Sequence, residues 1–338
     1  MEHGRQRLIV VTGASGQDGL ILTKALCLRG EHVVAIGSEE SKHNHMEEIV
    51  PAAHWIYSDS TYRLPLGEIK SKPTQIFHFA GASSVQNSWQ TPSQTIIRNV
   101  SIDSQVIEFA IKSGANLLLS GSSEMFPKQS GVVSERDPLK PSSPYGVSKA
   151  TAFELAGLLR DEGNLQVTNL IMFNHESPLR KPHFLTKKLS TQILEVAAGN
   201  RSKISVYNKS SAKDFSWAAD FIRAMLSKKI ADSNEDFVLA SGQSTSVSEL
   251  AQAGLDLLGL DAPILEENDS PSFAAPNPVG DSSKAEKVLG FTRTNGGREM
   301  MRKMIALEMR ASELNSLETQ KLVVEQMAEE ALSASSAQ

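Results

Sequence analysis

A glycine-rich turn directly after a short apolar run constrains the fold of this chain more than any other feature. The run Leu8–Thr12 leads into Gly13-Ala14-Ser15-Gly16-Gln17-Asp18-Gly19, and an amphipathic stretch, Gly19–Arg29, follows. Gly13 can make the tight turn, Gly16 lets the backbone approach a pyrophosphate, and Gly19 lets the helix pack closely on the sheet. The helix N-terminus then offers free N–H groups to the phosphates. The turn therefore predicts a dinucleotide site, with a turn that binds no ligand as the alternative.

Short apolar runs continue to alternate with longer amphipathic stretches through the first half of the chain. Near-continuous apolar strands separated by helices, one of which is expected over Ile97–Lys112, indicate a parallel sheet covered on both faces. This is an α/β fold with a doubly wound, Rossmann-like sheet, whose ligands bind beyond the carboxyl ends of the strands. The expected strands are Leu8–Thr12, His32–Ile36, His54–Tyr57, Gln75–Phe79, Asn116–Gly121 and Gln166–Phe173.

The second half is less regular, and we expect it to form a smaller C-terminal substrate lobe. The expected division is a dinucleotide-binding domain over 1–175, a substrate-binding lobe over 176–312 with some segments returning to the first domain, and a helical, partly disordered tail over 313–338. The stretch from about Gly297 to Ala331 has few helix breakers. Its last part is interpreted as a partner helix or a frayed, solvated helix. The other expected elements are a helix near Leu185–Ala198, strands at Ile204–Tyr207 and Asp236–Ala240, and a loop over Glu266–Pro278.

Composition excludes several classes of protein. A length of 338 residues suits one bilobed unit or two domains, and 40% hydrophobic and 22% charged residues are ordinary for a soluble globular protein. The net charge of -5 argues against a nucleic-acid partner. Cys27 is the only cysteine, which fits a reducing compartment, and the run Leu8–Val11 is too short for a signal peptide or a membrane span. We therefore expect a cytoplasmic protein without a membrane partner. His43-Asn44-His45 is interpreted as a solvated loop, and no metal site is expected.

A phenol and an ammonium stand four residues apart in Tyr145-Gly146-Val147-Ser148-Lys149, directly after Pro144. Pro144 suits the start of a helix, and the spacing puts Tyr145 and Lys149 on one helical face. A free tyrosine has a pKa of about 10 and is a poor base at neutral pH. A nearby ammonium and the positive nicotinamide ring would favour the phenolate, and the lysine can also hold the nicotinamide ribose. An ordinary surface pair is the alternative interpretation.

A second polar cluster, Gly121-Ser122-Ser123-Glu124, lies at the carboxyl end of an expected strand. Ser122 can hydrogen-bond the sugar oxygen that Tyr145 deprotonates. Glu124 can act as general base on a carbon acid and as general acid on a leaving hydroxyl. Alone, Glu124 could be a charged loop residue. Together with the glycine-rich turn and the Tyr145/Lys149 pair, it indicates catalysis.

These motifs together resemble the extended short-chain dehydrogenase/reductase family and, within it, the GDP-mannose 4,6-dehydratases. The resemblance extends over about residues 7 to 310, and Asn174–Pro178 is its most specific part. The matching segments are Thr12–Gly19, Ser122–Glu124, Ser143–Lys149, Phe173–Pro178, Phe184–Lys188, Lys213–Phe215, Asp236–Val238 and Gly280–Ala285.

The resemblance implies a bound NADP, a nucleotide-sugar substrate closest to GDP-mannose, and a homodimer or higher homo-oligomer. The catalytic residues that it implies are Ser122, Glu124, Tyr145 and Lys149. The residues expected to bind the substrate are Ser83, Asn174, Lys187, Lys188 and Lys213. The residues expected to bind the cofactor are Gly13, Ser15, Gly16, Gln17, Asp18, Gly19, Asp59, Ala80, Tyr145 and Lys149.

The sequence is less decisive about whether the cofactor is NAD or NADP, which carries an extra phosphate. A carboxylate after the second strand typically binds the ribose of NAD, whereas a basic residue binds the extra phosphate of NADP. The segment Gly37-Ser38-Glu39-Glu40-Ser41-Lys42 carries both signs of charge, so NAD is the alternative. Asp59, after the third strand, can accept a hydrogen bond from the adenine amino group or can be a solvated turn residue.

The leading hypothesis is a nucleotide-sugar 4,6-dehydratase that converts GDP-mannose to GDP-4-keto-6-deoxymannose through transient hydride transfer to the nicotinamide. One rival is a 4-epimerase or 4-keto reductase of the same family, which needs the Tyr145/Lys149 pair but no carboxylate at Glu124. The other rival is a dinucleotide-binding regulatory protein without turnover. The complete catalytic set argues against that rival.

Overall fold

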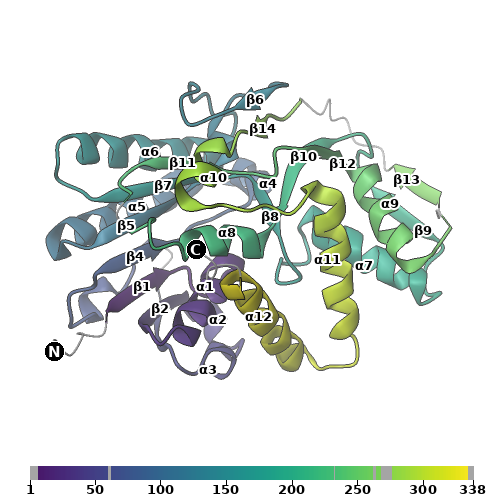
Figure 1. Cartoon of the computed structure of the whole chain (residues 1–338), viewed down its shortest axis with the longest axis horizontal. Helices are drawn as coiled ribbons and strands as arrows, with labels where there is room; N and C mark the ends of the chain where they lie inside the picture. Colours follow the sequence, from purple (N-terminus) through teal and green to yellow (C-terminus); the bar gives the residue numbers. More distant parts are fainter. Residues whose placement is uncertain (1–6, 60–61, 232, 262–263, 268–275, 334–338) are drawn as a thin grey trace.

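The computed structural model describes residues 7–59, 62–231, 233–261, 264–267 and 276–333. Its centre is a parallel seven-stranded sheet with the strand order β11-β7-β5-β4-β1-β2-β3 (Figure 1). These strands are β1 Leu8–Thr12, β2 His32–Ser38, β3 His54–Ser58, β4 Gln75–His78, β5 Asn116–Ser122, β7 Val167–Met172 and β11 Asp236–Leu239. The predicted Rossmann-like fold is confirmed, and each predicted strand of the first half agrees with an observed one to within two residues at either end.

The side chains of successive residues in each strand point to opposite faces of this sheet. Ile9 and Val11 of β1 pack with α1 (Gln17–Leu28) and α8 (Ala218–Met225), whereas Leu8 and Val10 pack with α5 (Pro92–Ser113) and α6 (Pro144–Asp161). These mostly apolar strands therefore bury both faces, as parallel strands covered by helices must. The carboxyl ends of β1, β4, β5 and β7 remain at one edge, where ligands of such folds bind.

The glycine-rich turn has the geometry that its residues predict. Gly13 takes a φ of 68°, a left-handed conformation that favours glycine. A Cβ atom at Gly19 would lie 2.4 Å from the Gly13 carbonyl oxygen. The turn therefore brings the start of α1 against the end of β1.

The second lobe is built around a three-stranded sheet of β8 (Asn174–Glu176), β10 (Ala212–Trp217) and β12 (Ser244–Ser246). β8 follows β7 almost directly, so this small sheet begins where the large sheet ends. The helices of the lobe are α7 Leu185–Ala197, α9 Val247–Leu258 and α11 Gly296–Arg310. The remaining elements are α2 Glu39–Lys42, α3 Met46–Ile49, η1 Leu66–Glu68, α4 Val85–Gln90, η2 Ser123–Met125, β6 Val132–Val133, β9 Lys203–Val206, β13 Ile264–Glu267, β14 Val279–Gly280 and α10 Ser283–Leu289.

Two expectations for the second half need correction. Glu266 and Glu267, expected in a loop, end strand β13, because this strand pairs in parallel with β9; residues 268–275 of that expected loop lie outside the described residues. The helix expected from about Gly297 to Ala331 is two helices, α11 and α12 (Ser316–Ser333). The chain turns between them, so that α12 runs back along α1 and α8 (Figure 1).

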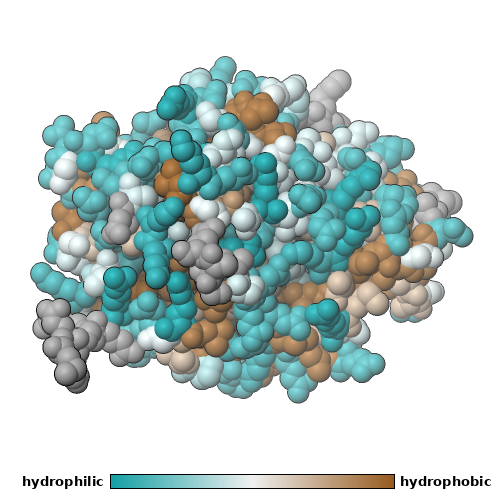
Figure 2. Space-filling model, viewed as in Figure 1, coloured by the Kyte–Doolittle hydropathy of each residue, from teal (hydrophilic) through white to brown (hydrophobic). Residues whose placement is uncertain are grey.

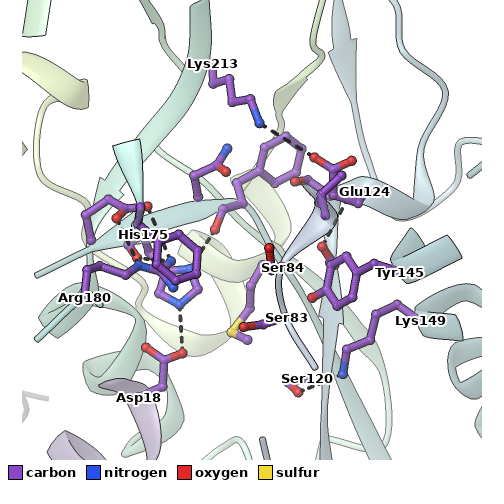
Figure 3. Close-up of a pocket in the computed structure, with 18 of the residues that line it drawn as sticks. Asp18, Ser83, Ser84, Ser120, Glu124, Tyr145, Lys149, His175, Arg180 and Lys213 are labelled. Atoms are coloured by element: carbon purple, nitrogen blue, oxygen red, sulfur yellow. Dashed lines mark hydrogen bonds and ion pairs between the residues drawn. The ribbon is translucent and has the colours of Figure 1, made fainter. Parts of the chain in front are cut away.

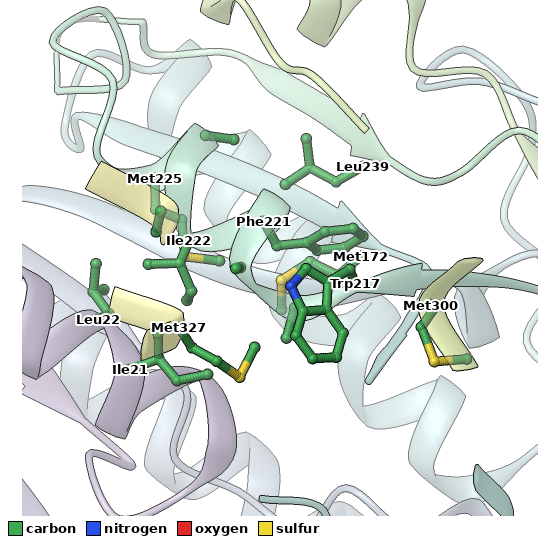
Figure 4. Packing of buried hydrophobic residues seen from close by; sticks show 14 of the residues in the cluster. Ile21, Leu22, Met172, Trp217, Phe221, Ile222, Met225, Leu239, Met300 and Met327 are labelled. Carbon is green, nitrogen blue, oxygen red and sulfur yellow. The ribbon is translucent and has the colours of Figure 1, made fainter. Parts of the chain in front are cut away.

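Helix α12 packs along one face against the rest of the chain. Its buried side chains are Val323, Val324, Met327, Ala328 and Ala331, which lie on one helical face. Met327 meets Ile21 and Leu22 of α1 in the core shown in Figure 4. The Trp217 indole donates a hydrogen bond of 2.9 Å to Glu330 Oε2. The expected tail is therefore an outer layer of the main core as far as Ser333, and residues 334–338 lie outside the described residues.

The face seen in Figure 2 carries mostly hydrophilic side chains, and its apolar side chains form separate patches. Within the described ranges, no helix has the length and apolar character needed to cross a membrane.

Candidate active site

A cavity of about 320 Å³ opens between the two lobes, at the carboxyl ends of the central strands. Its walls come from the loop after β4, the end of β5, the first turns of α6, strand β8 and strand β10 (Figure 3). Among the predicted site residues it brings together Asp18, Ser83, Ser122, Glu124, Tyr145, Lys149, Asn174 and Lys213. Residues from both halves of the sequence thus meet around one space.

The predicted catalytic carboxylate lies where β5 ends. The chain passes from β5 into the single-turn helix η2, and the Glu124 N–H donates a hydrogen bond of 3.2 Å to Ser122 Oγ. A Cβ atom at Gly146 would lie 2.4 Å from the Glu124 carbonyl oxygen. Glycine at this position therefore allows α6 to approach η2 closely. That contact places Tyr145, the residue before Gly146, beside Ser122 and Glu124.

Tyr145 and Lys149 occupy the first turns of α6, on the same side of the cavity as Glu124 (Figure 3). Ser143 Oγ caps this helix by accepting a 3.0 Å hydrogen bond from the Gly146 N–H. The Lys149 ammonium lies 3.5 Å from Ser120 Oγ, and both side chains line the cavity. The predicted phenol and ammonium therefore lie buried at the edge of the sheet where the fold binds ligands.

Two ammonium groups surround the Glu124 carboxylate. Lys128 Nζ lies 3.0 Å from Oε1 and 2.9 Å from Oε2, and Lys213 Nζ lies 3.8 Å from Oε1. Burial lowers the pKa of Lys213, an effect that the charge of Glu124 opposes and the charge of Lys128 reinforces. Lys213 lines the cavity and therefore presents a cation to whatever binds beside Glu124.

His175 and Asp18 contact each other on the side of the cavity opposite Glu124, Tyr145 and Lys149 (Figure 3). His175 Nε2 lies 3.0 Å from Asp18 Oδ2, and its Nδ1 lies 2.7 Å from the Phe173 carbonyl oxygen. Burial alone would raise the pKa of Asp18, but the charge of His175 and its hydrogen bond outweigh burial and lower this pKa to about 2. Burial alone would lower the pKa of His175, but the charge of Asp18 outweighs it and raises this pKa.

His175, Glu176 and Arg180 also line the cavity, although none of them was predicted to belong to the site. Arg180 donates to Glu176 through Nε at 2.9 Å and to the His175 carbonyl oxygen at 2.8 Å. Thr186 also donates to Glu176, at 2.6 Å. The motif Asn174–Pro178 carried the signal for two of these residues. Arg180 lies two positions beyond this motif. Only the structure shows that its guanidinium contacts His175 and Glu176.

The glycine-rich turn fits the pyrophosphate of a dinucleotide. Gly16 precedes the first residue of α1, and no side chain caps this helix among the described residues. Its first N–H groups are therefore open to an anion. The Gln17 side chain, predicted to contact the cofactor, is held by Ser177 Oγ at 2.7 Å and donates to the His175 carbonyl oxygen. Asp59 is exposed just beyond the end of β3, at the same edge of the sheet.

Lys187 and Lys188 are predicted to contact the substrate nucleotide, but the structure does not place them at this cavity. Lys187 Nζ is held by Glu308 Oε1 of α11 at 2.5 Å and lines a separate cavity between α7, α11 and α12. Lys188 is exposed on the next position of α7. The reason is the direction of α7, which points Lys187 toward α11. Within the described part of the chain, no three His, Cys, Asp or Glu side chains are grouped so that they could hold a metal ion.

Comparison with known proteins adds sequence and structural relatives. The family model described as GDP-mannose 4,6 dehydratase matches residues 10–304. GDP-mannose 4,6 dehydratase 1 of Arabidopsis thaliana is 27% identical, over 89% of each chain. The Homo sapiens GDP-mannose 4,6 dehydratase is 30% identical over 74% of this chain and 72% of its own. The solved structure of MoeE5 in complex with UDP-glucose and NAD is 25% identical with a TM-score of 0.76, covering 90% of this chain and 99% of that one.

Proposed function

Because the chain belongs to the GDP-mannose 4,6-dehydratase family, we propose that it removes water from the hexose of a nucleotide sugar. The observation that carries this proposal is the common cavity of Glu124, Tyr145 and Lys149. A carboxylate, a phenol and an ammonium around one space supply the two bases and the positive charge that the reaction needs. The sugar would occupy the space between them.

Tyr145 is proposed to take the proton of the C4 hydroxyl. The Lys149 ammonium favours the phenolate form through its charge, and Ser122 can hydrogen-bond the same sugar oxygen. A bound nicotinamide would supply the hydride acceptor and donor for this chemistry. The uncapped start of α1 behind Gly16 would hold its pyrophosphate.

Glu124 is proposed to take the C5 proton, which a ketone at C4 makes acidic, and then to protonate the C6 hydroxyl as it leaves. One carboxylate can serve both steps, because it accepts a proton as a base and returns it as an acid. The side chain of Glu124 is only 9% exposed, so the transfer takes place away from bulk water. A 4-epimerase or 4-keto reductase needs no such group, and this supports the dehydratase over those rivals.

We propose NAD as the cofactor rather than the NADP implied by the resemblance. Glu39 and Glu40 begin α2 directly after β2, and Glu39 pairs with Lys42 at 3.5 Å. A carboxylate at this position can accept hydrogen bonds from the ribose hydroxyls and would repel a 2′-phosphate. MoeE5 was solved with NAD bound.

GDP-mannose is the proposed substrate and GDP-4-keto-6-deoxymannose the proposed product. The names of the relatives support the substrate, and the cations Arg180 and Lys213 lie at the cavity that would receive it. The test is incubation with GDP-mannose, GDP-glucose, UDP-glucose and UDP-N-acetylglucosamine, followed by mass spectrometry. Loss of one water from GDP-mannose is the expected result. Conversion without any mass change would instead identify an epimerase.

A homo-oligomer is proposed on the outer face of α5 and α6. Ile97 of α5 and Leu158 of α6 are 59% and 65% exposed, and these two helices pack against each other. Burying them against a second copy would cover this face. Light scattering should give at least twice the monomer mass, and Leu158→Glu should lower it.

A further inference from the structure

Glu124 makes a contact that the proposed reaction does not by itself require. Lys128, four residues further along the chain, places its ammonium against both carboxylate oxygens, 3.0 Å from Oε1 and 2.9 Å from Oε2. Only the contact to Oε1 has the geometry of a hydrogen bond. Among the described residues, Oε2 accepts no hydrogen bond, although it is buried. One ammonium therefore lies against both oxygens of the carboxylate, and Oε1 accepts its hydrogen bond.

Lys128 reaches Glu124 from outside the cavity. Lys213 belongs to the cavity wall, whereas Lys128 is absent from the residues that line it in the described part of the chain. The Lys128 ammonium also donates a hydrogen bond of 3.1 Å to Asn277 Oδ1. Asn277 is held in turn, because its Nδ2 donates a hydrogen bond of 3.0 Å to the Ala212 carbonyl oxygen. Ala212 begins β10, next to Lys213. The lysine thus spans from the end of β5 to the substrate lobe.

We propose that Lys128 is a positioning residue for Glu124: held by Asn277 on its other side, it keeps the carboxylate ionised and in one orientation. This inference rests on the proposed dehydration. After taking the C5 proton, Glu124 must release it to the departing C6 hydroxyl. An adjacent ammonium favours the carboxylate over the carboxylic acid, and it therefore drives this release. A base held in one orientation also keeps its reactive geometry between the two steps.

Lys128→Gln tests the proposal because it removes the charge and keeps a polar side chain. The acid limb of the kcat/KM profile should move to higher pH, because the carboxylate loses its neighbouring cation. Dehydration should slow by about tenfold or more. Reduction of the bound cofactor on substrate addition depends on Tyr145 and should persist.

Lys128→Arg should restore the acid limb, because it keeps the charge. The matched control is Lys112→Gln, which removes the lysine of an exposed Lys112–Glu108 pair at the same spacing and 3.4 Å apart. It should leave the profile unchanged. An unchanged acid limb in Lys128→Gln, or equal effects of the Gln and Arg variants, would overturn the proposal.

A second measurement does not depend on turnover. Carbon-13 NMR of glutamate-labelled protein, with the Glu124 signal assigned through Glu124→Gln, follows the titration of Glu124 directly. The signal should titrate at higher pH in Lys128→Gln than in the wild type, and equal titrations would refute the role of Lys128. If the wild type dehydrates no sugar while this difference in titration is present, the proposed function fails and the Lys128–Glu124 relationship stands.

Discussion

His175 Nε2 and Asp18 Oδ2 lie 3.0 Å apart, although 157 positions separate them in the sequence. Asp18 belongs to the first turn of α1 and His175 to β8, so this pair joins the glycine-rich turn to the strand that enters the substrate lobe. The His175 ring also stacks on Phe221, with a centroid separation of 4.5 Å. This charged contact therefore links the two halves of the site.

Asp18→Asn should weaken this contact in a pH-dependent way. The pKa of Asp18 is lowered to about 2 from 3.8, so its contribution to stability is present above pH 3.8 and is lost as the pH falls toward 2. The pKa of His175 is raised from 6.5, so its contribution is present below pH 6.5 and is lost as the pH rises through the raised value. Thermal unfolding between pH 3 and 9 should show a loss of about 1 to 3 kcal/mol that is largest between these limits. The exposed Asp261→Asn is the control, and a difference independent of pH would contradict the ion pair.

Tyr145→Phe should abolish turnover while the protein stays folded and binds cofactor. The variant loses the phenol oxygen that is proposed to take the sugar proton, but the ring continues to fill its buried position. Absorbance at the reduced nicotinamide band after substrate addition measures the first step. Tyr207→Phe, at a 64% exposed position, should behave as wild type. Normal turnover in Tyr145→Phe would remove this residue from the mechanism.

Glu124→Gln should separate two steps of the reaction. General acid–base catalysis contributes about 10² to 10⁴ in rate, and the loss of dehydration should fall in or above that range. Removal of the C4 hydrogen relies on Tyr145, so reduced cofactor should build up with little dehydrated product. The exposed Glu108→Gln serves as the control. Dehydration at the wild-type rate would favour an epimerase or reductase instead.

The cofactor released from purified protein should be NAD. Glu39 follows β2 directly, and a carboxylate after the second strand disfavours a 2′-phosphate. Mass spectrometry of the denatured protein's supernatant identifies the nucleotide. Glu39→Arg should shift the preference toward NADP in a binding titration, whereas Glu68→Arg, on η1, should not. Release of NADP from the wild type would support the family resemblance over the local charge.

Met327→Ala should destabilise the whole molecule and not only its last helix. Met327 is fully buried against α1, and removing such a side chain costs about 2 to 5 kcal/mol. Chemical unfolding monitored by circular dichroism measures the loss. Met309→Ala, at a 47% exposed position on α11, is the matched control. An effect no larger than that of Met309→Ala would mean that α12 contributes little to the core.

The central sheet could be predicted from the sequence because its strands are short, mostly apolar and separated by amphipathic helical stretches. The Tyr145–Lys149 pair and the Ser122–Glu124 segment could also be predicted, because each is recognised from residues that are close together in the sequence. The contacts of Arg180, Lys128 and Lys187 were not predictable, because each depends on how separate segments meet: Lys128 with Asn277, and Lys187 with Glu308. Helix α12 was recognised as a helix, but its weak amphipathic pattern did not reveal which surface it covers.

The position of α12 has a consequence for how the protein is made. α1 is among the first elements to leave the ribosome, whereas the side chains that cover its outer surface, including Val324 and Met327, emerge near the end of translation. Until then, Leu20 and Ile21 of the nascent chain lack part of their native neighbours. The first lobe can therefore form its sheet during synthesis but completes its core only after nearly the whole described chain has been released, and exposed apolar surface in that interval is a target for chaperones. A ribosome-stalled chain that ends before Ser316 should bind such chaperones longer than one that ends after Ser333.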